Sequence, residues 1–306
     1  MIKRTVEISG KASSLSVRHN QLKIFQENSE VASIPCEDIG VLVVDHFGSS
    51  YTHPALLSIM DAGGVVLLCG ANHLPKAMIL PLSEHSEVVW RVEAQMTAKK
   101  TLKKRLWKQL IQEKIKGQGR NFPKDSSIRR KLFLLAARVR AGDPSNIEGQ
   151  AARYYWPQLM NNIDFRRNPD GSGANLFLNY GYAILRAALA RSIISAGLIP
   201  SLGLHHCNRS NYFCLADDLI EPLRPLVDHI VCNLIKHGES ELNLDTKEKL
   251  LSILTLPVKT GNFDGPLLVH LPRMIASLVR CYQGEAQWME IPKPCKSVDT
   301  EVCGSL

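Results

Sequence analysis

The sequence lacks a run of apolar residues long enough to cross a membrane. A membrane-spanning helix needs about 18–20 predominantly apolar residues, and the longest candidate here, residues 63–70 (GGVVLLCG), has only the length of a strand. The first ten residues (MIKRTVEISG) alternate polar and apolar side chains and lack the apolar stretch of a secretory signal. We therefore expect a protein that does not enter a membrane and that resides in the cytoplasm.

Closely spaced cysteine pairs are also missing. Eight cysteines are spread over 306 residues, and no CxxC sequence occurs. We expect reduced thiols, several of them buried as small apolar side chains. His205, Cys207 and Cys214 are a conceivable zinc set, but their spacing is not that of a zinc site.

The common catalytic and nucleotide-binding motifs are absent as well. The sequence contains no Walker A sequence, no GxGxxG fingerprint, no HExxH and no GxSxG. Nor does any serine or cysteine have the motif context of a nucleophile. These absences leave chemistry without a covalent protein intermediate as the simplest catalytic possibility.

Positive charge is abundant and unevenly distributed. Residues 99–140 contain fifteen Lys and Arg but only two acidic residues, Glu113 and Asp125, whereas the whole chain has a net charge of +8. A solvated helical face is the plain alternative, but such a face usually intersperses acidic residues for i,i+4 pairs. Concentrated positive charge favours binding to a phosphate backbone, so nucleic acid is the expected partner.

The order of predicted elements indicates an α+β fold. Up to residue 83 the pattern is rich in strands, with a hairpin turn at His19-Asn20, apolar strands at 40–45 and 65–69, a short helix at 53–62 and a last strand at 76–80. Helical patterns follow at 87–116, 126–141, 144–160, 173–196, 216–236, 246–254 and 265–283, with breaks at 117–123 and Asp143-Pro144 as a helix start. We predict a small N-terminal β-rich domain (1–83), a larger all-α domain (84–285) and a partly disordered tail (286–306).

Four positions in the helical part form a ligand set for a hard divalent cation. They are Glu148, one histidine of the pair His205-His206, Asp218 and Glu221. Carboxylates with one imidazole suit Mn²⁺ or Mg²⁺, and a cation would relieve the repulsion between acidic residues three apart on a helix. Each position alone also has a plain structural explanation, namely helix-dipole glutamates, core histidines and an acidic helix start.

Three segments, taken in order, resemble a known family. They are EGQAARYYW (148–156), FRRNPDGSGANLFLNYGYAILRAALAR (165–191) and GLHHCNRSNYFCLADDLIEPLRPLVD (203–228). Together they resemble the integrase subunit of CRISPR adaptation, which inserts new spacers, and most of all the form found in type II systems. The resemblance covers roughly residues 1–285, and it implies the same order of a β-rich part and a helical catalytic part.

The resemblance implies roles for individual residues. Glu148, His206 and Glu221 would bind Mn²⁺ or Mg²⁺, and His206 is preferred over His205 because the second histidine occupies the ligand position of this form. Asp218 would be a supporting catalytic carboxylate. Contacts to DNA would come from the basic segment and its neighbours: Lys103, Lys104, Arg153, Arg166, Arg167, Arg186 and Arg224.

The resemblance also implies an activity and partners. A 3′-hydroxyl of a captured double-stranded DNA fragment would attack a phosphodiester at the edge of the CRISPR repeat, and water in its place would make the site an endonuclease. The β-rich domain would form a homodimer, which would join a small ferredoxin-like partner protein. The alternative from another class is a nucleic-acid-binding scaffold without catalysis.

Overall fold

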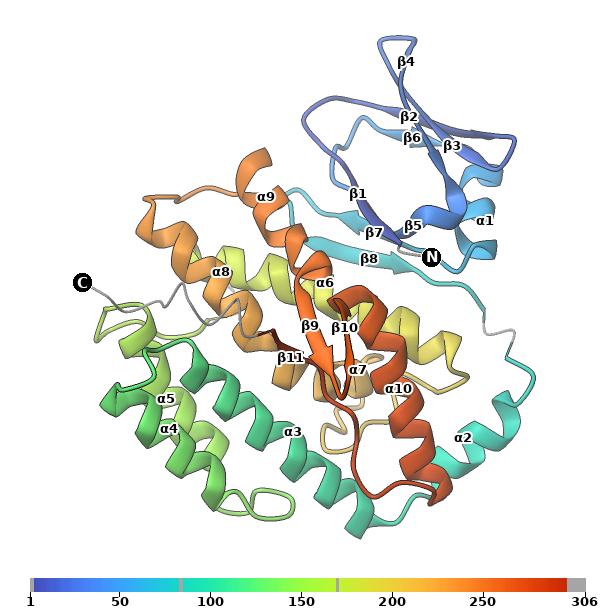
Figure 1. Ribbon diagram of the computed structural model, residues 1–306. Coiled ribbons are helices and arrows are strands. Elements are labelled where there is room, and N and C mark those ends of the chain that lie inside the picture. The colour runs from blue at the N-terminus through green and yellow to red at the C-terminus, as the bar shows by residue number, and fades with distance from the viewer. Residues whose placement is uncertain (1–2, 83–84, 169–170, 296–306) are drawn as a thin grey trace.

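The computed structural model describes residues 3–82, 85–168 and 171–295, and its order of strands and helices confirms the predicted α+β class (Figure 1). The first part contains β1 (Arg4–Ile8), β2 (Ser14–Arg18), β3 (Gln21–Gln26), β4 (Ser29–Pro35), the 3-10 turn η1 (Cys36–Asp38), β5 (Ile39–Val44), β6 (Ser50–Tyr51), α1 (His53–Asp61), β7 (Val65–Cys69) and β8 (Pro75–Ile79). The boundary expected at 83/84 lies outside the described residues.

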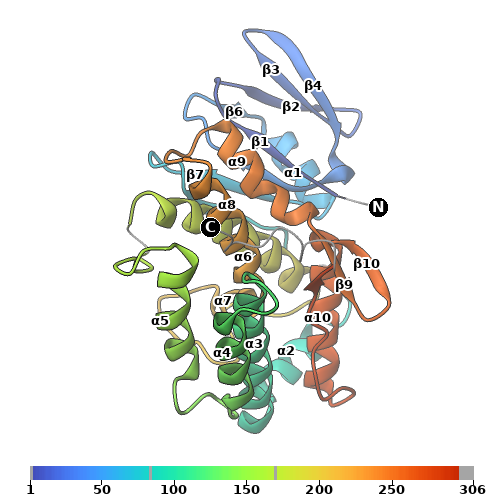
Figure 2. The same cartoon turned by 60° about the vertical axis from the view of Figure 1, so that its left-hand side comes forward.

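The second part is mostly helical. It contains α2 (Val88–Thr97), α3 (Lys100–Arg120), α4 (Ser127–Arg138), α5 (Ile147–Leu159), α6 (Ala174–Ser195), α7 (Cys214–Ile220), η2 (Glu221–Leu223), α8 (Arg224–Lys236), α9 (Leu244–Leu251), η3 (Ser252–Thr255), β9 (Pro257–Thr260), β10 (Phe263–Pro266), α10 (Leu267–Gln283) and β11 (Lys293–Pro294). In both views strands β1–β8 lie together at one end of the molecule and helices α3–α5 at the other (Figures 1 and 2).

One sheet joins the two parts because its strand β5 is buried on both faces. Its strand order is β1-β5-β7-β8, with β1, β5 and β7 parallel and β8 antiparallel to β7. Every residue of β5 is buried. Val41 and Val43 belong to the helical core, whereas Leu42 and Val44 belong to the core shared with the second sheet. The uninterrupted apolar run of β5 therefore reflects a strand covered on both sides.

The second sheet, of order β4-β3-β2-β6, closes the outer core of the first part. Its β2–β3 hairpin turns at His19 and Asn20, which both have positive φ, at 50° and 57°. That geometry is typical of a two-residue hairpin turn and confirms the turn predicted at this dipeptide. Leu15, Leu22 and Ile24 pack inward from this hairpin.

Helix α6 is the centre of the second part. It packs against α7, α8, α9 and α10 and against the inner face of the β1-β5-β7-β8 sheet. A side chain at Gly181 would meet Val227 of α8, because a Cβ there would lie 2.5 Å from its Cγ1. The glycine thus permits the close approach of α8, which follows the predicted acidic segment. Over the part of the chain that the structure describes, no helix is both long and apolar enough to span a bilayer.

A third, small sheet corrects the expectation that the second part is all-α. Strands β9, β10 and β11 form it in the order β10-β9-β11. The described part of the expected tail, 286–295, lies against the helical core rather than apart from it. Gln109 of α3 holds the Met289 backbone through two hydrogen bonds, of 2.8 and 3.0 Å, and Ile291 is buried. Residues 296–306 lie outside the described residues.

The prediction of one helix over residues 87–116 is wrong, because the chain forms two helices there and the second extends beyond residue 116. Ala98 and Lys99 have extended backbone, which separates α2 from α3. Helix α2 leaves Trp90 and Met96 of the supposed apolar stripe exposed, and it is held by buried Gln95, whose amide bonds the backbone of Ile199 and of Leu202. A polar anchor of this kind leaves no apolar periodicity in the sequence.

Helix α3 also continues through the predicted break at 117–123. It ends at Arg120, beyond Gly117 and Gly119. A Cβ at Gly117 would lie 3.0 Å from Pro225, and one at Gly119 would lie 2.8 Å from Phe133. These glycines therefore serve close packing against α8 and α4 rather than ending the helix.

A buried ion-pair cluster ties α9 to the two-sided sheet. The Lys247 ammonium of α9 contacts the Asp45 carboxylate beyond β5, and it lies 3.7 Å from Glu7 of β1. Both Lys247 and Asp45 are 4% exposed. Removing one partner of such a cluster leaves an uncompensated buried charge.

We predict that Lys247→Ala lowers the free energy of unfolding by about 3–5 kcal/mol, because Asp45 and Glu7 lose their shared cation. Urea denaturation measures the effect. Lys249→Ala is the matched control, because this exposed lysine pairs with Glu239 at 3.4 Å, and an exposed pair contributes at most about 1 kcal/mol. Equal losses in the two variants would contradict a structural role for the buried cluster.

Candidate active site

Glu148 lies in the first turn of α5, whose start is fixed by two side chains of the preceding loop. The Asp143 carboxylate accepts hydrogen bonds from the backbone N–H groups of Ile147 and Glu148, both at 2.9 Å, and Asn146 caps the helix at Gly149. Asp143 was expected to cap a helix from Pro144, but the helix begins at Ile147. The capping function is thus kept, and it fixes the backbone at Glu148.

Glu221 lies in η2, between α7 and α8, where Pro222 follows it. Its side chain is only 6% exposed, and its Oε1 accepts a hydrogen bond of 3.0 Å from Arg224 Nε. Burial alone would raise the pKa of Glu221, but Arg224 and Lys114 lower it below its usual value. Glu221 is therefore a buried, ionised carboxylate.

Lys114 of α3 joins the two glutamates. Its Nζ lies 2.6 Å from Glu148 Oε1 and 2.5 Å from Glu221 Oε2. Although burial alone would lower it, the pKa of Lys114 is raised above its usual value by the Glu221 and Glu148 carboxylates. Residues far apart in the sequence, at 114, 148 and 221, thus meet at one ammonium group.

Asp218 of α7 shapes the loop that carries the histidines. Its buried carboxylate accepts the backbone N–H groups of Leu204, His205 and His206 at 2.6, 2.9 and 3.2 Å. It also bonds His206 Nδ1 at 2.6 Å, and this hydrogen bond raises the pKa of His206. Asp218 therefore positions the histidine loop and holds the His206 ring through Nδ1, so that Nε2 is the ring nitrogen that could contact a ligand.

The two histidines have different surroundings. His205 stacks on Trp107 of α3, with ring centroids 4.2 Å apart and planes 3° from parallel. His206 lies edge-on to the same ring, at 5.5 Å. It also shares with Glu221 the lining of a cavity of about 470 Å³. His205 thus lies flat against α3, whereas His206 borders the space next to the acidic residues.

The structure does not gather the predicted ligands into a finished metal centre. Across residues 3–82, 85–168 and 171–295, no three His, Cys, Asp or Glu side chains already converge closely enough to bind a metal together, and this includes the conceivable zinc set. The predicted repulsion within the acidic segment is also relieved without a metal. Asp217 pairs with Arg186 at 2.9 Å, while Asp218 binds the histidine loop.

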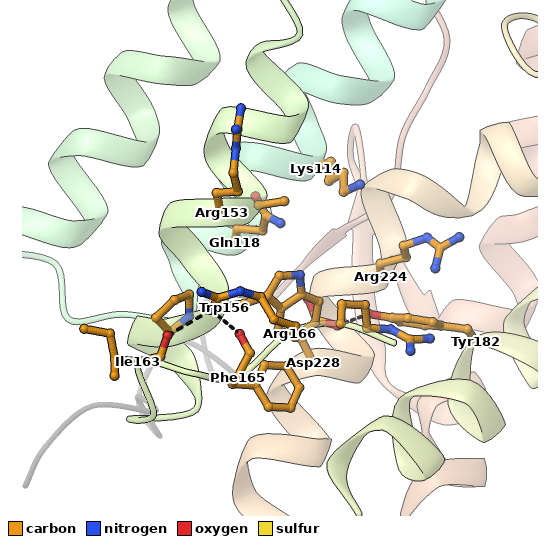
Figure 3. Close-up of a pocket in the computed structure, with 13 residues that line it drawn as sticks. Lys114, Gln118, Arg153, Trp156, Ile163, Phe165, Arg166, Tyr182, Arg224 and Asp228 are labelled. Atoms are coloured by element: carbon orange, nitrogen blue, oxygen red, sulfur yellow. Dashed lines mark hydrogen bonds between the residues drawn. The ribbon is translucent and has the colours of Figure 1, made fainter. Parts of the chain in front are cut away.

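A larger cavity of about 590 Å³ adjoins these groups and is rich in cations and aromatic rings (Figure 3). Lys114 of α3 and Arg153 of α5 line it, together with Arg166, Arg167 and Arg224. Trp156, Phe165 and Tyr182 supply its aromatic surface, and the Arg224 guanidinium lies 4.5 Å from the centre of the Tyr182 ring. Such a lining suits an anionic ligand that carries flat groups.

A buried aspartate supports the wall of this cavity. Asp228 of α8 accepts hydrogen bonds from the hydroxyl groups of Tyr155, at 3.0 Å, and Tyr182. Asn121, the residue that follows α3, donates to Tyr155 at 2.8 Å. Burial raises the pKa of Asp228 to about 6. The network holds the ring of Tyr182, over which Arg224 lies.

The predicted DNA-contacting residues fall into two groups. Arg153, Arg166, Arg167 and Arg224 line the larger cavity, and Arg186 lines the smaller one. Lys103 and Lys104 lie on α3 near its start, and neither is among the lining residues of these two cavities. Any contact of these lysines with DNA would therefore lie outside the cavities.

Comparisons with known proteins show the family of this chain. The family model described as "CRISPR associated protein Cas1" matches residues 6–254. The chain belongs to the Cas1 family. It is similar to the CRISPR-associated endonuclease Cas1 of Neisseria meningitidis serogroup C (strain 8013), with 35% identity over 269 residues, which cover 86% of this chain and 87% of that protein. The family expected from the three segments is thereby confirmed.

Two solved structures share the fold. One is a casposase bound to an integration product, with a TM-score of 0.76, 20% identity and coverage of 95% of this chain and 93% of that one. The other is a chain of a Cas6-RT-Cas1–Cas2 complex, with a TM-score of 0.75, 17% identity and coverage of 96% of this chain and 36% of that one. At these identities the likeness shows the fold alone.

Sequence reasoning missed several residues of this Cas1 site. Lys114 was counted only within the basic segment, yet it lies four residues after buried Leu110, among the apolar positions of α3. A lysine on the buried side of a helix is the signal that could have found it. Tyr155, Tyr182 and Asp228 lie in the quoted segments, but only the folded chain brings them together.

We predict that Asp228 makes the stability of this Cas1 protein fall as the pH rises from about 4 to above 6. The folded protein binds a proton at Asp228 more tightly than the unfolded chain, because its pKa is raised from 3.8 to about 6. A shift of about two units corresponds to at most about 3 kcal/mol. Relative to Asp228→Asn, the wild type should lose that stability over this pH range in urea denaturation.

Asp164→Asn removes an exposed carboxylate and serves as the control, with a pH profile parallel to that of the wild type. Parallel profiles for the wild type and Asp228→Asn would show that the buried carboxylate does not take up a proton in this range.

Proposed function

We propose that this chain is a metal-dependent DNA integrase and endonuclease that inserts captured DNA fragments into a CRISPR array. The observation that carries the proposal is that Glu148 and Glu221 both contact the Lys114 ammonium, close to His206. This convergence borders a cavity lined by arginines. The family and the casposase-like fold agree with it.

The donor set fits a hard divalent cation. Glu148, Glu221 and His206 would hold Mn²⁺ or Mg²⁺, and they offer two carboxylates and one imidazole. Glu221 Oε2 is buried and, within the described residues, has no well-directed hydrogen bond, although the Lys114 ammonium lies 2.5 Å away. When bound, the ion would polarise a phosphoryl oxygen and help to align the attacking and leaving oxygens.

The side chains of this protein supply the binding and the orientation. Arg167 and Arg224 lie beside both cavities and would bind the phosphates on either side of the reacting one. Asp218 fixes His206 through Nδ1, so that Nε2 would face the reacting groups. The 3′-hydroxyl of the fragment would attack the phosphorus of the repeat, and the original 3′ oxygen would leave. Attack by water would cleave the strand instead.

The partners follow from the same proposal. They are double-stranded DNA, a second copy of the chain bound through the β-rich part, and a small ferredoxin-like partner of the adaptation complex, with the reaction taking place in the cytoplasm. One structural neighbour is a chain of a Cas6-RT-Cas1–Cas2 complex, which supports the presence of a protein partner.

We predict that Glu148→Ala abolishes both strand cleavage and strand transfer, with a loss of at least about 100-fold, because the site loses one of its two charged donors. Affinity for DNA should stay within about twofold, since Glu148 is not a phosphate contact. Gel-based transfer assays with Mn²⁺ and fluorescence anisotropy measure the two effects. Glu285→Ala, at an exposed position beyond α10, is the matched control.

The same variant separates the proposal from the scaffold alternative. If the acidic residues served only for packing and capping, Glu148→Ala would leave any cleavage unchanged. A fully active variant would therefore exclude the proposed site.

We predict that the double variant Lys103→Glu with Lys104→Glu weakens DNA binding and reduces its dependence on salt. Each phosphate contact contributes about 0.9 to the slope of log K against log salt for duplex DNA, so the slope should become shallower by about 2. Anisotropy titrations between about 50 and 200 mM salt measure it. Lys236→Glu with Lys249→Glu changes the net charge equally at exposed positions on and near α8 and α9, and it should leave the slope unchanged.

A further inference from the structure

The Lys114 ammonium lies between the two carboxylates that would hold a divalent ion. It contacts Glu148 Oε1 and Glu221 Oε2. The other oxygen of Glu221, Oε1, is already bonded to Arg224 at 3.0 Å. An ion held by both glutamates would therefore compete with the lysine for Glu221, whose remaining oxygen is the one that contacts the ammonium. Two cations at contact distance from one pair of oxygens repel each other strongly.

The lysine has a place to which it could move. Lys114 is among the residues that line the cavity of about 590 Å³, and its side chain reaches this space from α3 (Figure 3). A lysine ammonium sits on a flexible four-carbon stem, which allows the charge to move without a change in the backbone. In that cavity the ammonium would join Arg153 and Arg224, where the proposed DNA phosphates would lie.

We propose that Lys114 is an internal substitute for the divalent cation: it holds Glu148 and Glu221 together before the ion arrives, and the ion displaces its ammonium into the cavity. The inference rests on the proposed function and extends it to the order of binding. A phosphate in the cavity gives the displaced ammonium a partner. Metal binding and DNA binding are therefore coupled, and each strengthens the other by the same factor.

A purely structural lysine would behave differently. If Lys114 only neutralised the two glutamates, its removal would lower stability and disorder the carboxylates, and Mn²⁺ would bind no better. If it competes with the ion, its removal strengthens Mn²⁺ binding even though the protein becomes less stable. The sign of the change in metal affinity therefore separates the two roles.

The experiment measures Mn²⁺ binding to the full chain without DNA, by electron paramagnetic resonance of free Mn²⁺ and by calorimetry. Lys114→Gln removes the charge and should bind Mn²⁺ about tenfold more tightly, which corresponds to about 1.4 kcal/mol. Lys114→Arg keeps the charge on a planar group that holds carboxylates in two-point contact, so it should bind Mn²⁺ more weakly than the wild type. Relative to the wild type, the Mn²⁺ affinity should thus rise in Lys114→Gln and fall in Lys114→Arg.

Lys116→Gln is the matched control. It removes a lysine of the same helix that pairs with another glutamate, Glu113, at 2.9 Å, and its Mn²⁺ affinity should equal that of the wild type. A short DNA duplex should raise the Mn²⁺ affinity of the wild type but not that of Lys114→Gln, because the charge that links the two ligands is gone.

Stability supplies a second measurement. Lys114→Gln leaves two carboxylates without their shared cation, so the variant should unfold at a lower temperature, and Mn²⁺ should raise that temperature more than in the wild type. Should Lys114→Gln not fold even with Mn²⁺, the affinity of Lys114→Arg decides: weaker binding supports the inference, and equal or tighter binding overturns it.

The possible failures are distinguishable. If the wild type binds Mn²⁺ and Lys114→Gln binds it equally or more weakly, the substitute role of Lys114 is wrong while the metal-dependent function stands. If neither the wild type nor Lys114→Gln binds Mn²⁺ at millimolar concentration, the proposed metal-dependent function is wrong and the inference fails with it.

Discussion

The ion-pair bridge between Lys114, Glu148 and Glu221 is the contact on which the site depends. It joins α3, α5 and η2, three elements that the chain reaches more than 30 residues apart. Without a cation, the half-buried Glu148 carboxylate and the buried Glu221 carboxylate would repel each other and favour protonation or exposure. Because the three charged groups meet, α5 and the start of α8 are held against α3, and the cavity wall forms between them. The same contact therefore fixes both the geometry of the candidate site and the packing of the helical part.

The acidic residues around this bridge have separate tasks. Asp143 fixes the first turn of α5, Asp218 gathers the backbone of the histidine loop, and Asp228 holds two tyrosine hydroxyls behind Arg224. Each of these carboxylates already accepts hydrogen bonds from N–H or O–H donors of the protein at both of its oxygens, unlike Glu148 and Glu221, which share the Lys114 ammonium. This division leaves the two bridging glutamates as the pair whose partner, a flexible lysine, can be replaced by an incoming ion.

Much of this arrangement could be predicted from local signals, and the failures have a common cause. The hairpin at His19-Asn20 and the doubly covered strand β5 follow from short-range patterns of turn residues and apolar residues. The errors at Gln95 and Gly119 arose where a residue satisfies a distant segment, either by hydrogen bonds to a loop or by allowing close helix packing. Glu148 and Glu221 were proposed from the donor types in the sequence and from the family resemblance, whereas their partner Lys114 was counted only as one of the positive charges of the basic segment.

The charge distribution gives the basic segment two functions at once. Most of its lysines and arginines are exposed or half-buried, where they would attract a polyanion, but Lys114 turns inward and neutralises acidic residues. Arg224 also has two roles, because it donates a hydrogen bond to Glu221 and borders the cavity of about 590 Å³. A phosphate that enters the cavity would therefore compete with Glu221 for Arg224 and Lys114. It would draw cations away from the glutamates at the moment when a divalent ion could take their place, so substrate and metal would assemble the site together.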